Sequence, residues 1–202
     1  MLNIAKKTLI LHQTKNNKKH PVMDTNKQFD RALAKCREVF VNKLGDYGPS
    51  WRIMRPAAIT DQLFIKAKRI RSLEVKGVSA VGEGILPEFI ALVNYSIIGI
   101  IQLNEGYADS KDMSTQRAIE LYDKIAAEAR TLMIAKNHDY DEAWRGMRVL
   151  SYTDLILMKI ERVKEIEDHQ GKTFVSEGID ANYMDIINYA CFGIIKLSDE
   201  NS

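Results

Sequence analysis

The sequence predicts an all-α protein in which a three-helix unit has been duplicated in tandem, with the two copies packed as an intrachain pseudo-dimer. Three observations lead to this prediction. A long stretch of the chain repeats itself, apolar residues recur at helical spacing in both copies, and only 4 of the 202 residues are proline. With 46% hydrophobic and 28% charged residues, the chain has the composition of a soluble globular protein.

The repeat consists of two blocks. Residues 46–69 recur 93 residues later without a gap, and residues 83–103 recur 94 residues later. The period is too long, and two copies are too few, for a solenoid built from repeats of roughly 20–50 residues. We therefore expect residues 24–104 and 118–198 to be two repeats of one globular domain, joined by a connector at 105–117. The identical pairs of the first block are Asp46/Asp139, Tyr47/Tyr140, Trp51/Trp144, Arg52/Arg145, Met54/Met147, Arg55/Arg148, Thr60/Thr153, Asp61/Asp154, Lys66/Lys159 and Arg69/Arg162.

Each copy is expected to contain three helices. The first has an apolar stripe at helical spacing. The second begins at a Thr-Asp pair, which suits the free N–H groups and the dipole of a helix start, and the third is strongly apolar and therefore buried. A loop separates the first two helices, and in the second copy this loop is expected to be partly helical. The expected helices are 29–44, 60–74 and 87–103 in the first copy, and 122–135, 153–168 and 182–197 in the second.

Charge is distributed unevenly along the chain. Residues 1–22 carry five lysines and no acid, so the rest is mildly acidic although the formal net charge is +2. This argues against a global nucleic-acid-binding surface, and we expect residues 1–23 to be a basic, disordered arm, with Met23 as an alternative start of the protein.

The sequence also bears on compartment and partners. No apolar run approaches the roughly 20 residues of a membrane span. Cys36 and Cys191 are isolated and are expected to be buried, reduced thiols. The expected localisation is cytoplasmic, without a membrane partner, and a homo-oligomer is left open.

The repeated cations are candidates for binding phosphate. Within each copy a lysine and an arginine stand three apart on one helical face, and two arginines precede that helix. Several cations near a helix start commonly hold a di- or triphosphate. The alternative is that they form salt bridges to Asp46, Asp61, Asp139 and Asp154, which would close the loop onto the helix. The phosphate-binding candidates are Lys66, Arg69, Arg52 and Arg55 in the first copy, and Lys159, Arg162, Arg145 and Arg148 in the second.

Two aromatic residues of the second copy, Trp144 and Tyr140, are candidates for stacking on a nucleobase, as are their first-copy counterparts Trp51 and Tyr47. The alternative is that the repeated tryptophan anchors the core where the loop meets the helix.

Acids gained by the second copy suggest a metal site. Glu161 and Glu165 lie four apart on one helix, and Asp185 lies in the next, apolar helix, three residues before Asn188. A buried acid needs a partner, and oxygen ligands on adjacent helices suit Mg²⁺ shared with substrate phosphates. Glu161, Glu165 and Asp185 are therefore candidate metal ligands and candidate catalytic residues. The alternative is that Asp185 caps a neighbouring group or pairs with Arg162 or Lys159.

Several strings resemble a known family. They are DYGPSWR at 46–52, TDQ at 60–62, KNHDY at 136–140, EAWRGMRV at 142–149 and SEGIDANY at 176–183. Over about residues 24–198 the chain resembles bacterial proteins of a domain of unknown function that is also called nucleotide modification associated domain one. The resemblance implies an all-helical protein associated with nucleotide or modified-base metabolism.

A weaker resemblance is to all-helical nucleotide pyrophosphohydrolases of the MazG and dimeric dUTPase type. Those proteins bind Mg²⁺ through Glu-Glu-x-x-Glu on one helix and Glu-x-x-Asp on the next. The nearest equivalents in this chain are Glu161-x-x-x-Glu165 and Asp185-x-x-Asn188, so one spacing and one residue type differ from that pattern.

The leading hypothesis from the sequence is a nucleotide-binding protein that acts as a Mg²⁺-dependent nucleoside triphosphate pyrophosphohydrolase, in which the metal would activate water and the cations would neutralise charge on the phosphates. The first alternative is a non-catalytic helical module that binds a nucleotide or a partner protein. The second is a structural dimerisation protein, in which the cations only hold the loops in place.

Overall fold

The computed structural model describes residues 24–77, 82, 84–172, 175 and 177–199. The predicted basic arm lies outside these residues. In the described part of the chain all regular structure is helical, and each repeat contributes three α-helices and one short 3₁₀ turn. The first repeat contains α1 (Thr25–Tyr47), η1 (Ser50–Ile53), α2 (Pro56–Lys76) and α3 (Leu86–Glu105), and the second contains α4 (Thr115–Tyr140), η2 (Ala143–Gly146), α5 (Val149–Asp168) and α6 (Ile179–Asp199).

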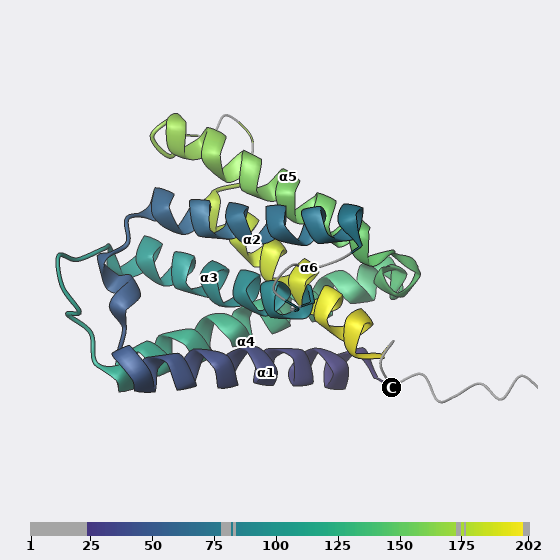
Figure 1. Ribbon diagram of the computed structural model, residues 1–202, viewed down its shortest axis with the longest axis horizontal. Coiled ribbons are helices and arrows are strands. Elements are labelled where there is room, and N and C mark those ends of the chain that lie inside the picture. Colours follow the sequence, from purple (N-terminus) through teal and green to yellow (C-terminus); the bar gives the residue numbers. More distant parts are fainter. Residues whose placement is uncertain (1–23, 78–81, 83, 173–174, 176, 200–202) are drawn as a thin grey trace, which may run out of the picture.

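The helices form three layers, each made of one helix from each repeat (Figure 1). In the view of Figure 1, α2 and α5 form the upper layer, α3 and α6 the middle layer, and α1 and α4 the lower layer. The middle pair contacts both outer layers and supplies much of the buried apolar surface. Every layer therefore pairs a helix with its own copy, which confirms the predicted fold class of two three-helix units packed as an intrachain pseudo-dimer.

Two reciprocal contacts show the pseudo-twofold relation at the level of side chains. In the middle layer, Gly99 of α3 faces the ring of Tyr183 on α6, and Gly193 of α6 faces the ring of Phe89 on α3. A Cβ atom added at Gly99 would lie 2.6 Å from the nearest ring atom, and one added at Gly193 would lie 2.7 Å away. Glycine at both places lets the two central helices approach closely.

The upper layer repeats the same symmetry with polar groups. The hydroxyl of Thr60 on α2 donates to Glu167 on α5 at 2.8 Å, and that of Thr153 on α5 donates to Glu74 on α2 at 2.7 Å. Both threonines are fully buried. The prediction that they begin the second helices is therefore wrong. These helices begin four residues earlier, at Pro56 and at its counterpart Val149. Pro56 suits the first turn of α2, because proline there gives up only an N–H that has no helical partner.

The central helix α3 is long and apolar enough to cross a membrane by length and composition, with a mean hydropathy of 1.6 over its most apolar window. However, 72% of that window is buried inside the protein, against the other helices. Its apolar surface is therefore accounted for by the core of the domain. The predicted buried thiols are also confirmed, since Cys36 and Cys191 are both free and buried, and burial raises the pKa of Cys36 to about 12.

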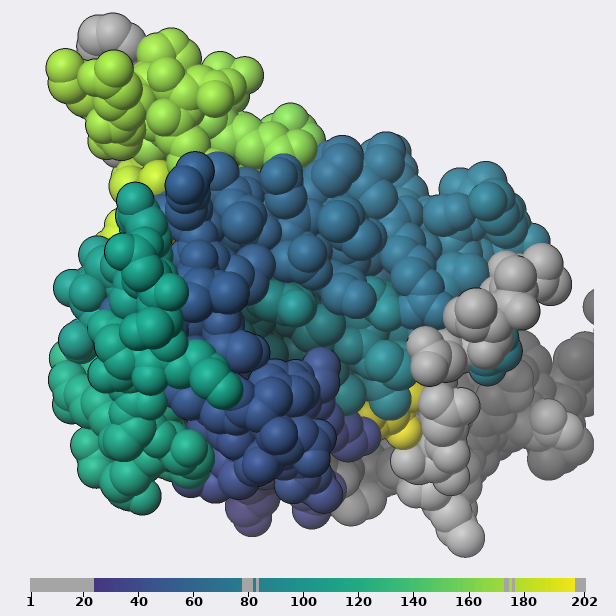
Figure 2. All heavy atoms as spheres, turned by 60° about the vertical axis from the view of Figure 1, so that its left-hand side comes forward, coloured from purple at the N-terminus to yellow at the C-terminus, as the bar shows by residue number. Residues whose placement is uncertain are grey.

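The connector between the repeats folds back onto the first one (Figure 2). The buried side chain of Arg52 in η1 holds it, since its guanidinium pairs with Asp112 at 2.8 Å and donates to the carbonyl oxygen of Gly106 at 2.5 Å. The backbone N–H of Ala108 donates to the carbonyl of Arg52 at 2.9 Å. Gln102 of α3 completes the arrangement by donating to three carbonyl groups of the η1 segment.

Candidate functional site

Two of the pockets, one in each repeat, occupy equivalent places. We call them the first-repeat pocket, of about 570 Å³, and the second-repeat pocket, of about 300 Å³. Each is enclosed by the end of the first helix, the 3₁₀ turn and the third helix of its own repeat. Six pairs of identical residues at equivalent positions line both pockets: Lys43/Lys136, Tyr47/Tyr140, Trp51/Trp144, Met54/Met147, Asn94/Asn188 and Tyr95/Tyr189.

A buried ion-pair cluster lies at one side of the second-repeat pocket. Asp185 of α6 binds Lys136 of α4 through Oδ1 at 2.5 Å and Lys159 of α5 through Oδ2 at 2.6 Å. Burial by itself would raise the pKa of Asp185, but the hydrogen bonds and charges of the two lysines outweigh it and hold this pKa below its ordinary value of 3.8. The carboxylate is therefore ionised at neutral pH and joins three helices.

The amide of Asn188 is the most unusual group in this pocket. Asn188 is 4% exposed, and neither the nitrogen nor the oxygen of its amide has a hydrogen-bond partner in the described part of the chain. The indole N–H of Trp144, also buried, has none either. Buried polar groups are nearly always paired in folded proteins. Because Asn188 lines the pocket, its unpaired amide makes it the first candidate in this pocket for contact with a polar ligand.

The equivalent amide in the first repeat is fully used inside the protein. Asn94 donates to the carbonyl of Cys36 at 3.1 Å and accepts from the hydroxyl of Tyr122 at 2.8 Å. Those bonds join α3 to α1 and to α4. The same residue type at equivalent positions is thus structural in one repeat and unpaired in the other.

The two base-stacking candidates differ in how accessible they are. Trp144 is 5% exposed, Phe192 stacks on it at 4.6 Å between ring centroids, and the guanidinium of Arg145 lies 4.4 Å from its centroid. This ring is an anchor of the core, as the alternative held, and it is not free to stack on a base. Tyr140, by contrast, is 70% exposed and lines the mouth of the pocket, so base stacking by Tyr140 stays a prediction.

The predicted metal site of Glu161, Glu165 and Asp185 does not assemble. Glu161 and Glu165 lie on the exposed face of α5, and Glu161 is close to Lys164 at 3.5 Å, whereas Asp185 is buried and points to the lysines. Among the described residues, no group of three His, Cys, Asp or Glu side chains is placed to hold a metal ion. The prediction is wrong in its geometry because Asp185 pairs with Lys159, the alternative that the sequence left open.

Most of the predicted phosphate-binding cations pair with protein groups. Lys66 and Arg69 of α2 both bind the buried Glu88, and Lys159 binds Asp185. The acid partner has shifted by one helical turn between the repeats, since Asn182 of α6 stands where α3 has Glu88.

The two arginines that follow the tryptophans hold the backbone in place. Arg52 binds the connector, and Arg145 binds Glu142 and the residues Thr25 and Gln28 of α1. The salt-bridge alternative is therefore right in kind but wrong in its partners, apart from a surface contact between Arg71 and Asp154 at 3.6 Å.

Three of the predicted cations remain exposed. They are Arg55, Arg148 and Arg162, and none of them forms an ion pair with a residue that the structure describes. Arg162 lies close enough to Tyr189, which lines the second-repeat pocket, for its charge to lower the pKa of that phenol, although burial and Asp185 raise the pKa overall. Arg162 thus lies near a residue that lines the second-repeat pocket.

Sequence reasoning missed the two lysines at the ends of the first helices, Lys43 and Lys136. They are identical at the 93-residue offset but lie just outside the block in which the identities are dense. Extending the alignment by one helical turn toward the N-terminus would have found them.

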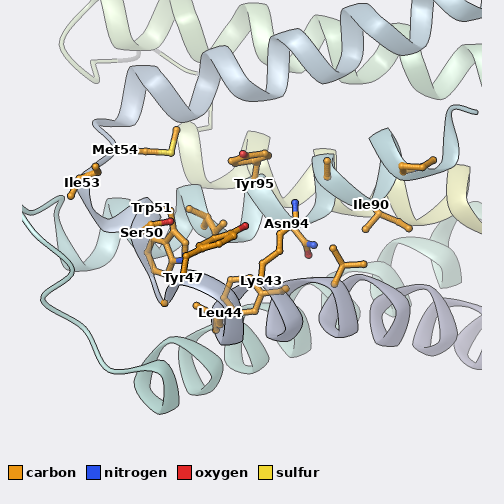
Figure 3. A pocket seen from close by; sticks show the side chains of 16 residues that line it. Lys43, Leu44, Tyr47, Ser50, Trp51, Ile53, Met54, Ile90, Asn94 and Tyr95 are labelled. Carbon is orange, nitrogen blue, oxygen red and sulfur yellow. The ribbon is translucent and has the colours of Figure 1, made fainter. Parts of the chain in front are cut away.

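The first-repeat pocket, drawn in Figure 3, is larger than its counterpart. Figure 3 shows Lys43 of α1 lying between Tyr47 and Asn94, with Trp51 beyond and Tyr95 on the opposite wall. No acidic residue lines this pocket, because Ala91 stands where the second repeat has Asp185.

Comparison with protein families matches two segments of the chain, residues 43–103 and 136–197, to the same family, described as nucleotide modification associated domain 1. The two matches together cover more than half of the chain. The chain belongs to this family. No curated protein and no solved structure matches it.

The two matched segments of nucleotide modification associated domain 1 begin at Lys43 and at Lys136. Each segment therefore contains one pocket's lysine, tyrosine, tryptophan and Asn-Tyr pair, together with the second helix that carries the cation pair. The family unit and the pocket-forming unit coincide, and this chain contains two of them.

Proposed function

We propose that the second-repeat pocket binds a nucleoside or nucleotide, with the base inside and the phosphates at the mouth, and that the protein is a binding module without a hydrolytic centre. The observation that carries the proposal is the unpaired amide of Asn188. An asparagine amide presents a donor and an acceptor in the spacing of a base edge, which is how Asn reads adenine in nucleic acids. The family description, which refers to nucleotide modification, agrees with this ligand class.

The size and rim of the pocket support this arrangement. A volume of about 300 Å³ is at the lower end of small-molecule sites, which suits a base with part of its sugar. Tyr140, at the mouth, offers an exposed ring to a base, and stacking of this kind contributes about 1–3 kcal/mol per base. The cluster of Lys136, Lys159 and Asp185 keeps one net positive charge, and Arg162 adds another near the place where phosphates would leave the pocket.

Binding without turnover is favoured over the pyrophosphohydrolase hypothesis. Hydrolysis of a triphosphate by a helical enzyme of that type needs several carboxylates converging on Mg²⁺. The acid in this pocket, Asp185, is instead neutralised by two lysines. Mg²⁺ that enters with the phosphates of a nucleotide stays a prediction, and it has no three-carboxylate site in the part of the chain that the structure describes.

The test is a panel of nucleosides and nucleotides, with and without Mg²⁺, measured by calorimetry and by thermal shift, with phosphate release followed in parallel. The wild-type protein should bind at least one base class, and Asn188→Leu should reduce that affinity at least tenfold, because the new side chain keeps the branching at Cγ but not the amide. Tyr140→Ala should weaken the same ligand by a similar factor.

The matched control is Asn94→Leu, the equivalent change in the first repeat. This variant should bind the nucleotide with wild-type affinity per folded molecule, because the first-repeat amide does not face the second-repeat pocket. Equal affinities of wild type and Asn188→Leu, or no binding across the panel, would contradict the proposal. Mg²⁺-dependent release of pyrophosphate would restore the hydrolase hypothesis.

A further inference from the structure

The two pockets have diverged in charge, and this divergence has a chemical consequence. In the second repeat, Lys136 is neutralised by Asp185. In the first, Ala91 stands at the position of Asp185, and no described residue forms an ion pair with the equivalent Lys43. The lysine was kept in both copies, whereas the acid is present in only one.

The polar groups that line the first-repeat pocket are mainly donors. Besides the ammonium of Lys43, the buried indole N–H of Trp51 has no acceptor in the described part of the chain. The hydroxyl groups of Ser50, Tyr47 and Tyr95 can each donate as well. The amide that would read a base edge is unavailable, because Asn94 is bonded to Cys36 and Tyr122. A pocket with donors, a cation and no carboxylate is complementary to an anion.

The rest of the lining is apolar and belongs to α1, η1 and α3. It includes Val39, Phe40, Leu44, Ile90 and Ile98, which together with the aromatic rings enclose most of the volume of about 570 Å³. A ligand that fills this pocket must bury an apolar body and place its charge beside Lys43.

We propose that the first-repeat pocket is a second binding site, for an organic anion whose aromatic or aliphatic body fills the apolar interior and whose carboxylate, sulfonate or phosphate group is held by Lys43. This site goes beyond the proposed nucleotide site and does not depend on it. The two pockets then bind different classes of molecule, because one reads a polar edge through Asn188 and the other pairs a charge through Lys43.

The experiment uses two fluorescent probes on the full chain. The first is 8-anilinonaphthalene-1-sulfonate, an apolar aromatic monoanion, and the second is N-phenyl-1-naphthylamine, its uncharged analogue. Both should bind with a stoichiometry of one. Lys43→Gln should weaken the anionic probe about tenfold, the effect of one charge-assisted hydrogen bond, and should leave the affinity for the neutral probe within twofold.

Two further variants sharpen the result. Ala91→Asp places a carboxylate where the second repeat has Asp185, so it should pair with Lys43 and weaken the anionic probe as much as Lys43→Gln does. Lys35→Gln, an exposed lysine on the same helix, makes the same change in net charge and should have no effect. If Ala91→Asp does not fold, Lys43→Gln decides alone, because Lys43 is exposed and its replacement leaves the core intact.

Three outcomes would overturn the inference. The first is equal binding of the anionic probe by wild type and Lys43→Gln. The second is an equal loss of both probes in Lys43→Gln. The third is a loss of the anionic probe in Asn188→Leu, which would place it in the other pocket. A failure of nucleotide binding, with this pattern of probe binding intact, would refute the proposed function and leave this site standing.

Discussion

Asn94 and Asn188 occupy equivalent positions in the two repeats, but their side-chain amides are in different states. Asn94 links three helices through Cys36 and Tyr122, while Asn188 has no partner among the described residues. A hydrogen bond of a buried amide contributes about 0.5–1.5 kcal/mol, whereas an unpaired buried polar group costs about 1–3 kcal/mol. Replacing asparagine by leucine should therefore have opposite effects on stability at these two positions.

Asn94→Leu should lower the free energy of unfolding by about 1–3 kcal/mol, because the Tyr122 hydroxyl and the Cys36 carbonyl lose their partner. Asn188→Leu should leave the stability unchanged or raise it, because it removes an unpaired amide from the ligand-free protein. Urea unfolding of both variants measures the difference. A loss in Asn188→Leu as large as that in Asn94→Leu would mean that the Asn188 amide is bonded in solution.

A second prediction concerns Asp185 and the dependence of folding stability on pH. Because the lysines hold its pKa below the ordinary value, its ion pairs stabilise the fold fully above about pH 4 and lose this effect as the pH falls through the lowered pKa. Asp185→Asn should cost about 3–5 kcal/mol at pH 7, since Lys159 is 7% exposed and would be left without a counter-charge. The difference in melting temperature between this variant and wild type should shrink below pH 4. A difference that is constant from pH 7 to pH 3 would contradict the ion-pair assignment.

At the scale of the helices, the close approach of α3 and α6 depends on two glycines and two aromatic rings. Gly193 meets Phe89, and Gly99 meets Tyr183, so each helix supplies one small and one large residue to the other. The contact is repeated by the symmetry, and it fixes the register of the two most buried helices.

Gly193→Ala should therefore destabilise the protein by about 1–3 kcal/mol, the usual cost of forcing an extra methyl group into a packed core, because the new Cβ would lie 2.7 Å from the Phe89 ring. Adding Phe89→Leu should recover part of the loss. The coupling between the two changes is measured by a double-mutant cycle in urea. Strictly additive effects would show that the methyl group is accommodated by another route.

The helices were predictable from the sequence to within one turn at most ends, because apolar spacing and the internal repeat agreed in both copies. The ends of α4 were not, since they lie seven and five residues outside the predicted 122–135. The beginnings of α2 and α5 were placed four residues too late, because Thr60 and Thr153 look like caps and in fact make hydrogen bonds to the opposite helix. A capping residue and a buried inter-helix donor have the same sequence signature, and only the partner helix distinguishes them.

The pocket residues show a similar limit. The sequence located the cations and acids correctly on their helices, but a charge pattern does not say which acid meets which base. Lys159 and Asp185 meet across two helices, while Glu161, two residues after Lys159, faces outward. The exposed Tyr140 remains a stacking candidate, and the buried Trp144 does not. Burial of a side chain depends on all six helices, which no local spacing can encode.

At the scale of the whole molecule, the three layers interleave the repeats, and residues of both repeats form one continuous core. The middle helix of each repeat contacts the middle helix and one outer helix of the other. The connector, exposed over Asp109 and Ser110, carries little of this contact. The covalent link should therefore be dispensable once the protein has folded.

A protease site inserted between Asp109 and Ser110 tests this expectation. After cleavage the two fragments should elute together from a size-exclusion column under native conditions and separate only in denaturant. The melting temperature of the cleaved protein should fall with dilution, because unfolding then releases two chains, while that of intact protein should not. Fragments that separate without denaturant would contradict the interleaved packing.

Equivalent positions hold Ala91 in the first repeat and Asp185 in the second, and this difference bears on how mutations can alter the two pockets. In a dimer of two identical chains, one altered codon changes both pockets at once, so a new acid would neutralise both lysines together. Here each pocket has its own codons within one gene, and the same symmetric scaffold can keep one pocket while the other takes on a new ligand. The duplicated chain thus retains the stability of a twofold design but is released from having two identical sites.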